Sequence, residues 1–362
     1  MCSSDPKKVD ADGKPLEGVG FRVYTADGQE VTKNVVTTDS RGMATFVLTS
    51  ADEGTTYVLR EVSWPEGYKP AKDKTITVKP REYDDLSQDA SEWIVNESNY
   101  AALTVNKFGV LDKAGDGRAP IVDYVGAEQA KNFSFTVERS LDAAFADESL
   151  KDADYREVLT LDQASSVSLT VERTNSEGKT WHYRVTENEP ANGYDAYYET
   201  LTGPQFIDFA AEGKVSGEVS FDDLAKRQIR LTKKAWEMDA DGNVNALTDL
   251  SGMEFELLRY TEWTGSAEAL EATDLHITLG ADGHANFTDL PVTDEHGALY
   301  YYVLHEVNNT KYEVTANCRT VELNGETYLI PGDFGDKQVN YLEITAENKE
   351  KVDRKSVGRE RV

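Results

Sequence analysis

Apolar and polar residues alternate along short stretches of this chain, with turn residues between the stretches. In the stretch Thr56–Tyr68, Glu61 follows two large apolar residues onto the same face, because side chains alternate along a β-strand. The pattern recurs twice, each time as an aromatic or aliphatic strand with one Glu and a Tyr a few residues later. Three copies predict three related domains. The two further copies are Thr180–Tyr194 and Leu299–Tyr312.

Short alternating segments separated by turn signals are typical of a β-sandwich or barrel. Lys74–Pro80, for example, reads KTITVKP and alternates throughout. The polar, Ala-rich segment Asp142–Asp154 is the exception, and we expect a loop or one helical turn there. The linkers between the copies are short, which predicts a stiff rod. The predicted domains are residues 1–100, 101–226 and 227–352.

Each predicted domain carries a lysine on its opening strand, a glutamate on a middle strand and an amide or acid on its closing strand. Strand register places these groups on the apolar face: Leu103 and Val105 share a face with Lys107, and Phe221 shares one with Asp223. The candidate sets are Lys8, Glu61 and Asn96; Lys107, Glu187 and Asp223; and Lys233, Glu306 and Asn348.

Inward-facing groups of these types can form an amide bond with one another. Burial lowers the pKa of a lysine and raises that of a glutamate, so the amine becomes nucleophilic and the carboxyl can polarise a carbonyl oxygen and shuttle protons. Lysine would attack the side-chain carbonyl carbon, releasing ammonia from Asn or water from Asp. The fold supplies proximity, which is worth ~7–11 kcal/mol in well-aligned cases. The product would be an isopeptide bond between the first and last strands, formed once, with Glu61, Glu187 and Glu306 as the catalytic groups.

The alternative interpretation is that each set is a buried ion pair or a group of exposed charges at strand ends. One set alone would favour that interpretation. Three inward-facing sets in the same order favour the cross-link.

Charge and composition exclude several classes of function. The 362 residues include 66 acidic and 38 basic side chains, for a net charge of −28, which excludes a nucleic-acid partner and suits a soluble surface protein. No apolar run reaches the length of a membrane-spanning helix, so we expect no membrane contact. The five His show no ligand spacing and no cofactor fingerprint is present, so we expect neither a metal nor a cofactor.

Both ends of the sequence look cut. The last ten residues, Asp353–Val362, are strongly basic and resemble translated adapter sequence, so we expect 353–362 to be a non-native tail. We therefore expect an internal fragment of a longer surface protein, with its signal peptide and anchor outside the fragment.

Two motifs of the first predicted domain resemble a known family. Lys8–Phe21 (KVDADGKPLEGVGF) and Tyr57–Tyr68 (YVLREVSWPEGY), with the closing Val95-Asn96, are similar to the B-type repeats of collagen-binding adhesins and to pilin subunits of Gram-positive bacteria. The third domain resembles them moderately but lacks the Pro-x-Gly-Tyr turn after its Glu. The second resembles the related pilin isopeptide-linkage type. The resemblance implies an all-β, tandem array of transthyretin-like or inverse-immunoglobulin β-sandwiches, often with Lys–Asn or Lys–Asp cross-links.

The same resemblance implies a function and a location. We expect structural stalk or pilin-like shaft domains of an extracellular, cell-wall-anchored protein, and not a turnover enzyme. The alternatives are a ligand-binding adhesin region, for which exposed surfaces near Trp64 and Trp263 could serve, and accessory domains of a larger secreted enzyme. The partners that these hypotheses imply are neighbouring pilin subunits and a host extracellular-matrix protein or glycan.

Overall fold

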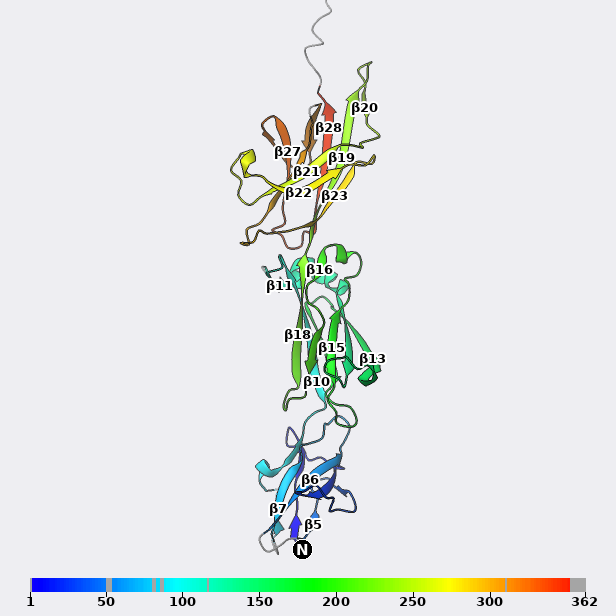
Figure 1. The fold of residues 1–362 in the computed structure, drawn as a ribbon, viewed down its shortest axis with the longest axis vertical. Helices are drawn as coiled ribbons and strands as arrows, with labels where there is room; N and C mark the ends of the chain where they lie inside the picture. The colour runs from blue at the N-terminus through cyan, green and yellow to red at the C-terminus, as the bar shows by residue number, and fades with distance from the viewer. Residues whose placement is uncertain are drawn as a thin grey trace, which may run out of the picture.

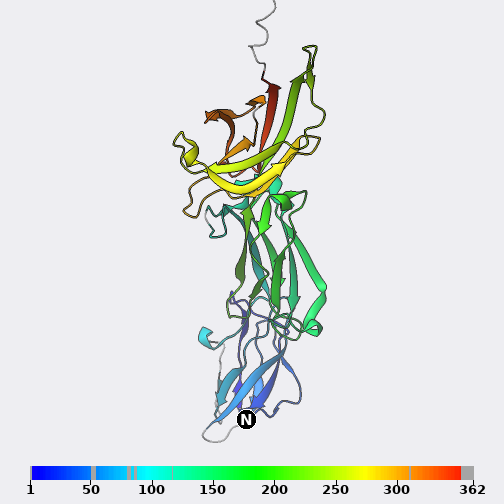
Figure 2. The ribbon, with the colours of Figure 1, turned by 45° about the horizontal axis from the view of Figure 1, so that its top comes forward.

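The computed structural model is an elongated stack of β-sheets, which Figures 1 and 2 show from two directions. It describes residues 2–49, 54–79, 83–84, 88–115, 117–309 and 311–351. The predicted tail at 353–362 lies outside these residues. The sheets form three successive groups along the chain, and no sheet of the described residues mixes strands from two groups. We call these groups the first, second and third units. The prediction of an all-β tandem array is confirmed.

The first unit is made of three small sheets, with strand orders β5-β1-β8, β2-β9 and β4-β3-β6-β7. Its core lies between them, and Phe21 meets Phe46 edge to face across it with ring centroids 6.3 Å apart. The elements are β1 (Cys2–Ser4), β2 (Lys8–Asp10), β3 (Gly20–Thr25), β4 (Val36–Thr37), β5 (Phe46–Leu48), β6 (Thr55–Ser63), β7 (Lys74–Val78), β8 (Tyr83–Asp84), the 3-10 turn η1 (Ala90–Glu92) and β9 (Ile94–Asn96).

The second unit is a sandwich of two sheets. One has the order β11-β10-β18-β16, with β14 also paired to β10, and the other has the order β13-β12-β15-β17. Phe135 and Phe221 pack across the interior with ring centroids 5.1 Å apart. The elements are β10 (Tyr100–Val110), β11 (Ala119–Pro120), α1 (Ile121–Val125), η2 (Ala127–Asn132), β12 (Ser134–Ser140), η3 (Glu148–Leu150), β13 (Lys151–Thr160), β14 (Ser166–Glu172), β15 (His182–Glu187), η4 (Tyr194–Ala196), β16 (Tyr198–Thr200), β17 (Gln205–Asp208) and β18 (Ser216–Ala225).

The third unit repeats this two-sheet plan, with the orders β20-β19-β28-β25, plus β23 on β19, and β22-β21-β24-β27-β26. Its main core contains Leu231 and Ile344 from the first sheet and Phe255 and Leu304 from the second. The elements are β19 (Arg227–Met238), β20 (Val244–Ala246), β21 (Glu254–Tyr260), η5 (Ala267–Ala269), β22 (Glu271–Thr278), β23 (His284–Leu290), β24 (Tyr301–Glu306), β25 (Tyr312–Ala316), β26 (Arg319–Leu323), β27 (Glu326–Asp333) and β28 (Tyr341–Glu350).

A strand near the start of each unit lies parallel to the unit's closing strand. The pairs are β2 with β9, β10 with β18, and β19 with β28. Alternation along these strands sends every second side chain inward: in β10, Leu103, Val105 and Lys107 are buried, and the residues between them are partly exposed. The pairing therefore brings inward-facing groups from the two ends of a unit side by side.

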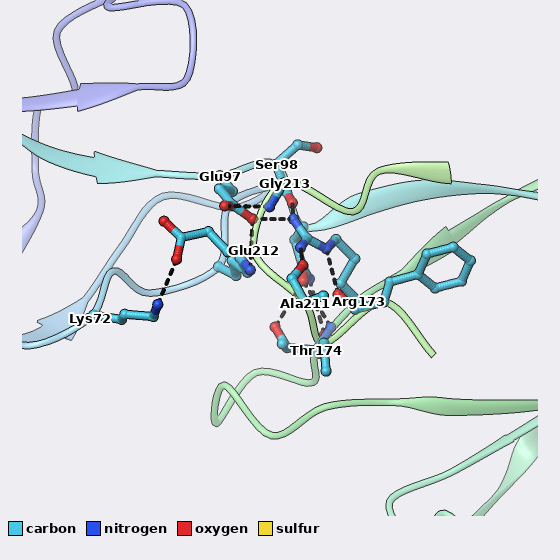
Figure 3. A network of polar contacts seen from close by, with 12 residues as sticks. Lys72, Glu97, Ser98, Arg173, Thr174, Ala211, Glu212 and Gly213 are labelled. Atoms are coloured by element: carbon cyan, nitrogen blue, oxygen red, sulfur yellow. Dashed lines mark hydrogen bonds and ion pairs between the residues drawn. The ribbon is translucent and has the colours of Figure 1, made fainter. Parts of the chain in front are cut away.

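The first two units are fastened to each other by a buried arginine (Figure 3). Arg173, which is fully buried, donates to Glu97 Oε2 at 2.7 Å and to the Ser98 carbonyl at 3.0 Å, both on the chain that joins the units. It also donates to the carbonyls of Phe209 (3.1 Å) and Ala211 (2.8 Å) in the second unit. The junction is therefore hydrogen-bonded on both sides.

The second junction also contains a fully buried arginine, Arg227. It donates to the Lys337 carbonyl at 2.8 Å and to Asn340 Oδ1 at 3.2 Å, both in the third unit. The hydroxyl of Tyr198, in the second unit, donates to the same Asn340 oxygen at 3.2 Å. Only Lys226 separates β18 from β19, so these contacts act on a junction with almost no free linker.

Two expectations about individual segments need adjusting. The segment Asp142–Asp154 does contain the short turn η3, but its end belongs to β13, an edge strand that pairs with β12. Most β13 side chains are exposed and polar, so the strand has no apolar period to read. Trp64 and Trp263 are half-buried rather than exposed, and Trp263 packs on Tyr260 with ring centroids 5.1 Å apart. No helix of the described residues is both long and apolar enough to span a membrane.

Candidate functional site

Each unit brings its lysine, glutamate and amide or acid together inside the core, and we call each set a triad. The strand register is the same in all three. Lys8 lies opposite Ile94, two residues before Asn96. Lys107 lies opposite Phe221, two residues before Asp223. The third unit repeats this offset, with Lys233 opposite Ala346 and Asn348 two residues further on. A lysine side chain is long enough to lean along the sheet across this offset, so all three triads share one register.

The glutamate of each triad comes from the middle strand of the other sheet, where its partner in the register is a phenylalanine. The pairs are Phe21 with Glu61, Phe135 with Glu187, and Phe255 with Glu306. All three phenylalanines are at most 1% exposed. Each carboxylate therefore enters a site with an aromatic wall, which is an unfavourable place for an isolated charge.

In the first unit, Lys8 Nζ contacts Asn96 Oδ1 and lies 3.4 Å from Glu61 Oε2. The amide of Asn96 donates through Nδ2 to Glu61 Oε1 at 2.6 Å. The backbone N–H of Ala71 donates to Glu61 Oε2 at 3.1 Å. The side chains of Lys8 and Glu61 are each 1% exposed, so the three groups interact almost without solvent.

The second unit has two acids on one lysine. Lys107 Nζ lies 2.6 Å from Glu187 Oε1, 2.8 Å from Glu187 Oε2 and 2.5 Å from Asp223 Oδ1. All three side chains are at most 1% exposed. One lysine cannot neutralise two carboxylates, so the site favours a proton on one of them.

In the third unit, Lys233 Nζ lies 2.9 Å from Glu306 Oε2 and 2.5 Å from Asn348 Oδ1. Asn348 Nδ2 donates to Glu306 Oε1 at 2.8 Å and to Oε2 at 3.0 Å. Asn309 Nδ2 donates to Glu306 Oε2 at 3.2 Å. The Glu306 side chain is 7% exposed, and it lines two hollows of about 340 and 370 Å³. This triad is therefore the one closest to solvent.

Burial makes the lysines easier to deprotonate and the glutamates better able to hold a proton. Desolvation lowers the pKa of Lys8 to about 8, against the attraction of Glu61, and lowers the pKa of Lys233 in the same way. Desolvation raises the pKa of Glu61. It raises the pKa of Glu187 to about 8, and the charge of Asp223 adds to the rise. A neutral amine beside a protonatable carboxyl is thus accessible near neutral pH.

The orientation of the Asn amides differs from the expected one. We expected the glutamate to polarise the side-chain carbonyl oxygen, but in the first and third units Glu61 and Glu306 accept from the amide nitrogen, and the carbonyl oxygen faces the lysine. The carboxyl therefore lies beside the group that would leave as ammonia, where a general acid must lie.

The aspartate turns near the candidate lysines have a structural explanation. Asp10 Oδ1 accepts the backbone N–H groups of Asp12 (3.0 Å) and Lys14 (2.9 Å), which closes a tight turn with Gly13 in the left-handed region at φ 80°. Asp239 does the same for Asp241 and Asn243. No cluster of three or more potential metal ligands occurs within the described residues.

Reasoning from the sequence missed the junction arginines and the donor Asn309. Arg173 follows β14 and Arg227 begins β19, and their neighbours look like ordinary sandwich residues. Their partners Glu97 and Lys337 are distant in the sequence. Asn309 lies where the third unit departs from the Pro-x-Gly-Tyr turn. That departure was itself the signal for a local difference at this glutamate.

Comparison with known proteins supports the predicted resemblance. Residues 3–90 match the model of the SpaA family, described as a prealbumin-like fold domain. This stretch contains Lys8 and Glu61 and ends before Asn96. The resemblance predicted for the first unit is thereby confirmed, and this stretch is similar to prealbumin-like domains of pilin type. No curated protein sequence matches the chain.

Several solved structures are similar over 96% of this chain. The Bacillus anthracis TIE protein has 17% identity and a TM-score of 0.38, and 51% of its chain is covered, so the present chain spans about half its length. BcpA, the major pilin subunit of Bacillus cereus, has 14% identity, 99% coverage of its chain and a TM-score of 0.32. Two B repeat units of the Staphylococcus aureus collagen-binding protein have 14% identity, 75% coverage and a TM-score of 0.24. These superpositions are loose.

Proposed function

We propose that this chain is a segment of the stalk or shaft of a Gram-positive surface protein, and that an intramolecular isopeptide bond closes each of its units. The observation that carries the proposal is the threefold repetition of a buried Lys–Glu–Asn/Asp triad at one register between a unit's parallel strands. A single buried ion pair is common. Three buried triads with the same register offset, each with a phenylalanine beside its glutamate, favour a common function.

The reaction in the first and third units converts an amine and an amide into a new amide and ammonia. Neutral Lys8 Nζ attacks Cγ of Asn96, the Nζ–Cγ bond forms, and the Cγ–Nδ2 bond breaks. Glu61 takes a proton from the attacking amine and delivers it to Nδ2, which it already contacts at 2.6 Å. Lys233, Glu306 and Asn348 do the same in the third unit. The carboxylate ends in its starting state, but the site is consumed, so each unit reacts once.

In the second unit, Lys107 condenses with the carboxyl group of Asp223. The Nζ–Cγ bond forms and a Cγ–O bond breaks, and the leaving oxygen departs as water with protons relayed by Glu187. The two acids share the site with one lysine, so the pair holds a proton that can go to the leaving oxygen.

Such bonds suit a mechanical role. Each joins a unit's opening and closing parallel strands, through which a pull on the chain enters and leaves. The protein would act outside the cell, attached to the cell wall through parts of the parent chain, with neighbouring pilin subunits or a host matrix protein as partners. It would not turn over a substrate.

The intact mass of the purified chain tests the proposal. We expect it to fall below the mass calculated from the sequence by two ammonia molecules and one water molecule. Glu61→Ala and Glu306→Ala should each restore one ammonia, and Glu187→Ala should restore the water. Asp73→Asn is a matched control, because this exposed partner of Arg60 lies outside every triad. A wild-type mass equal to the calculated mass would refute the proposal.

A further inference from the structure

The glutamates of the two Asn-bearing triads share a contact that the Asp-bearing triad does not make with any residue that the structure describes. Glu61 Oε2 accepts the Ala71 N–H at 3.1 Å, and Glu306 Oε2 accepts Asn309 Nδ2 at 3.2 Å. Both donors come from outside the triad. We call each of them the outside donor.

Glu187 has no outside donor among the described residues. Its carboxylate contacts Lys107 and lies beside Asp223, and both are members of the triad. The presence of an outside donor correlates with the residue on the closing strand. The two units with an outside donor carry Asn there, and the unit without one carries Asp.

We propose that the outside donor adapts the glutamate of a unit to the Lys–Asn reaction, and that Asn309 is the positioning residue that provides this donor in the third unit. This inference rests on the proposed function and adds to it the determinant of whether ammonia or water leaves. It explains why the third unit can dispense with the Pro-x-Gly-Tyr turn.

The physical reason is the protonation state that each reaction needs from its glutamate. With Asn, the carboxylate must first accept a proton from the amine, so it has to be ionised and turned toward Nδ2. Hydrogen bonds donated to a carboxylate favour its charged form. The Ala71 N–H accordingly opposes the rise in the pKa of Glu61 that burial causes. With Asp, a proton must remain on the two acids, and an outside donor would work against it.

The two outside donors reach equivalent oxygens by different routes. Ala71 offers its main chain after the turn Pro65–Tyr68. Asn309 offers its side chain, and its own orientation is fixed because Tyr312 N–H donates to Asn309 Oδ1 at 3.0 Å. A main-chain N–H donates to the glutamate in the first unit, and a side-chain amide donates to the corresponding oxygen in the third. This indicates that the site requires a hydrogen bond to the carboxylate, whichever group provides it.

The test uses Asn309→Ala in the full chain, with the time course of each cross-link followed by peptide mass spectrometry after cell-free synthesis. We expect the Lys233–Asn348 bond to form about tenfold more slowly, the size of effect expected for one hydrogen bond to a charged group. The first and second units are internal controls and should be unaffected. Asn245→Ala, an exposed asparagine in β20, is the matched control for the third unit.

Two readouts separate positioning from a general loss of structure. In Asn309→Ala, the pH at which the third bond forms at half its maximal rate should move upward, because the carboxylate ionises less readily without its donor. Asn309→Ser, which restores a donor, should recover part of the rate, whereas Asn309→Asp, which cannot donate when ionised, should not. An unchanged rate and pH profile in Asn309→Ala would overturn the inference.

The second unit provides the reciprocal experiment. Asp223→Asn should release ammonia at least tenfold more slowly than the third unit of the same chain, since Glu187 has no outside donor. Release at the same rate as in the third unit would also overturn the inference. Failure of the proposed function looks different, because then no bond forms in any unit of the wild-type chain.

Discussion

Arg173 of the second unit donates a hydrogen bond of 2.7 Å to Glu97, the residue that directly follows Asn96. Glu97 also pairs with Lys69 of the first unit at 2.7 Å and accepts the Gly213 N–H at 2.8 Å. Burial alone would raise the pKa of Glu97, but these three donors outweigh it and hold the pKa below its ordinary value. One carboxylate thus ties the closing strand of the first unit to the second.

Glu97→Gln should uncouple the first two units. The substitution leaves Arg173 buried without its counter-charge, so we expect the free energy of unfolding to fall by about 2 kcal/mol. This is less than for a fully buried ion pair, because Glu97 is partly exposed. We expect calorimetry to show one joint transition of the first two units in the wild type and two separate ones in the variant. Small-angle scattering should show a broader range of lengths for the variant. Glu212→Gln is the control, because its pair with Lys72 is exposed and screened by solvent, so its loss should leave the profile unchanged. Identical profiles for all three proteins would contradict this view of the junction.

The first cross-link should form faster as the pH rises toward 8. Only the neutral amine of Lys8 is nucleophilic, and its pKa is lowered to about 8 by desolvation. The neutral fraction therefore grows about tenfold per pH unit below that value and levels off above it. Peptide mass spectrometry of chains synthesised at pH 6, 7, 8 and 9 would measure the rates. A rate that continues to rise beyond pH 9 would mean that the lysine keeps an ordinary pKa.

Lys107→Met should make stability depend on pH in a chain whose second bond cannot form. Glu187 and Asp223 then remain buried without a cation, and the pKa of Glu187, already raised to about 8, rises further. A carboxyl with a raised pKa in the folded state binds its proton more tightly there than in the unfolded chain. Stability is then greatest at acidic pH and falls as the pH rises from about 5 through 8. Urea titrations across this range should show the decline, and the added substitution Glu187→Gln should flatten it.

Glu61→Gln should lower the free energy of unfolding of the first unit by removing its cross-link. The bond between Lys8 and Asn96 closes a loop of 88 residues, and closing a loop of that size stabilises the folded state by roughly 4–5 kcal/mol through the entropy of the unfolded chain. Thermal unfolding followed by circular dichroism would measure the difference. Asp73→Asn, which leaves the bond intact, should stay within about 0.5 kcal/mol of the wild type. A cross-linked mass in Glu61→Gln would show that this carboxyl is dispensable.

The sequence was sufficient to predict which side chains of a strand face the core. Lys107 points inward because side chains alternate along a strand, which places Lys107 on the same face as the apolar Leu103 and Val105. The choice of Asp223 over Asp222 follows in the same way, and the structure buries the first and leaves the second partly exposed. That these residues react with one another stays a prediction.

Other features could not be read because they have no local period. β13 is a polar edge strand defined only by its pairing with β12. Arg173 and Glu97 are 76 residues apart, and nothing near either residue signals the other. The rotation of an amide toward a carboxylate, which places Glu61 at the nitrogen of Asn96, depends on three side chains packed together.

The shared register of the triads has a consequence for how far the chain could lengthen under load. With all three bonds closed, tension would pass from Asn96 along the backbone to Lys107 and from Asp223 to Lys233, and the folded remainder of each unit would carry none of it. These two connecting stretches lie largely within β10 and β19, which are strands and thus already near their full contour. An array of such units would hold almost no stored length to release, so a pull at one end would reach the other without stretching the units between.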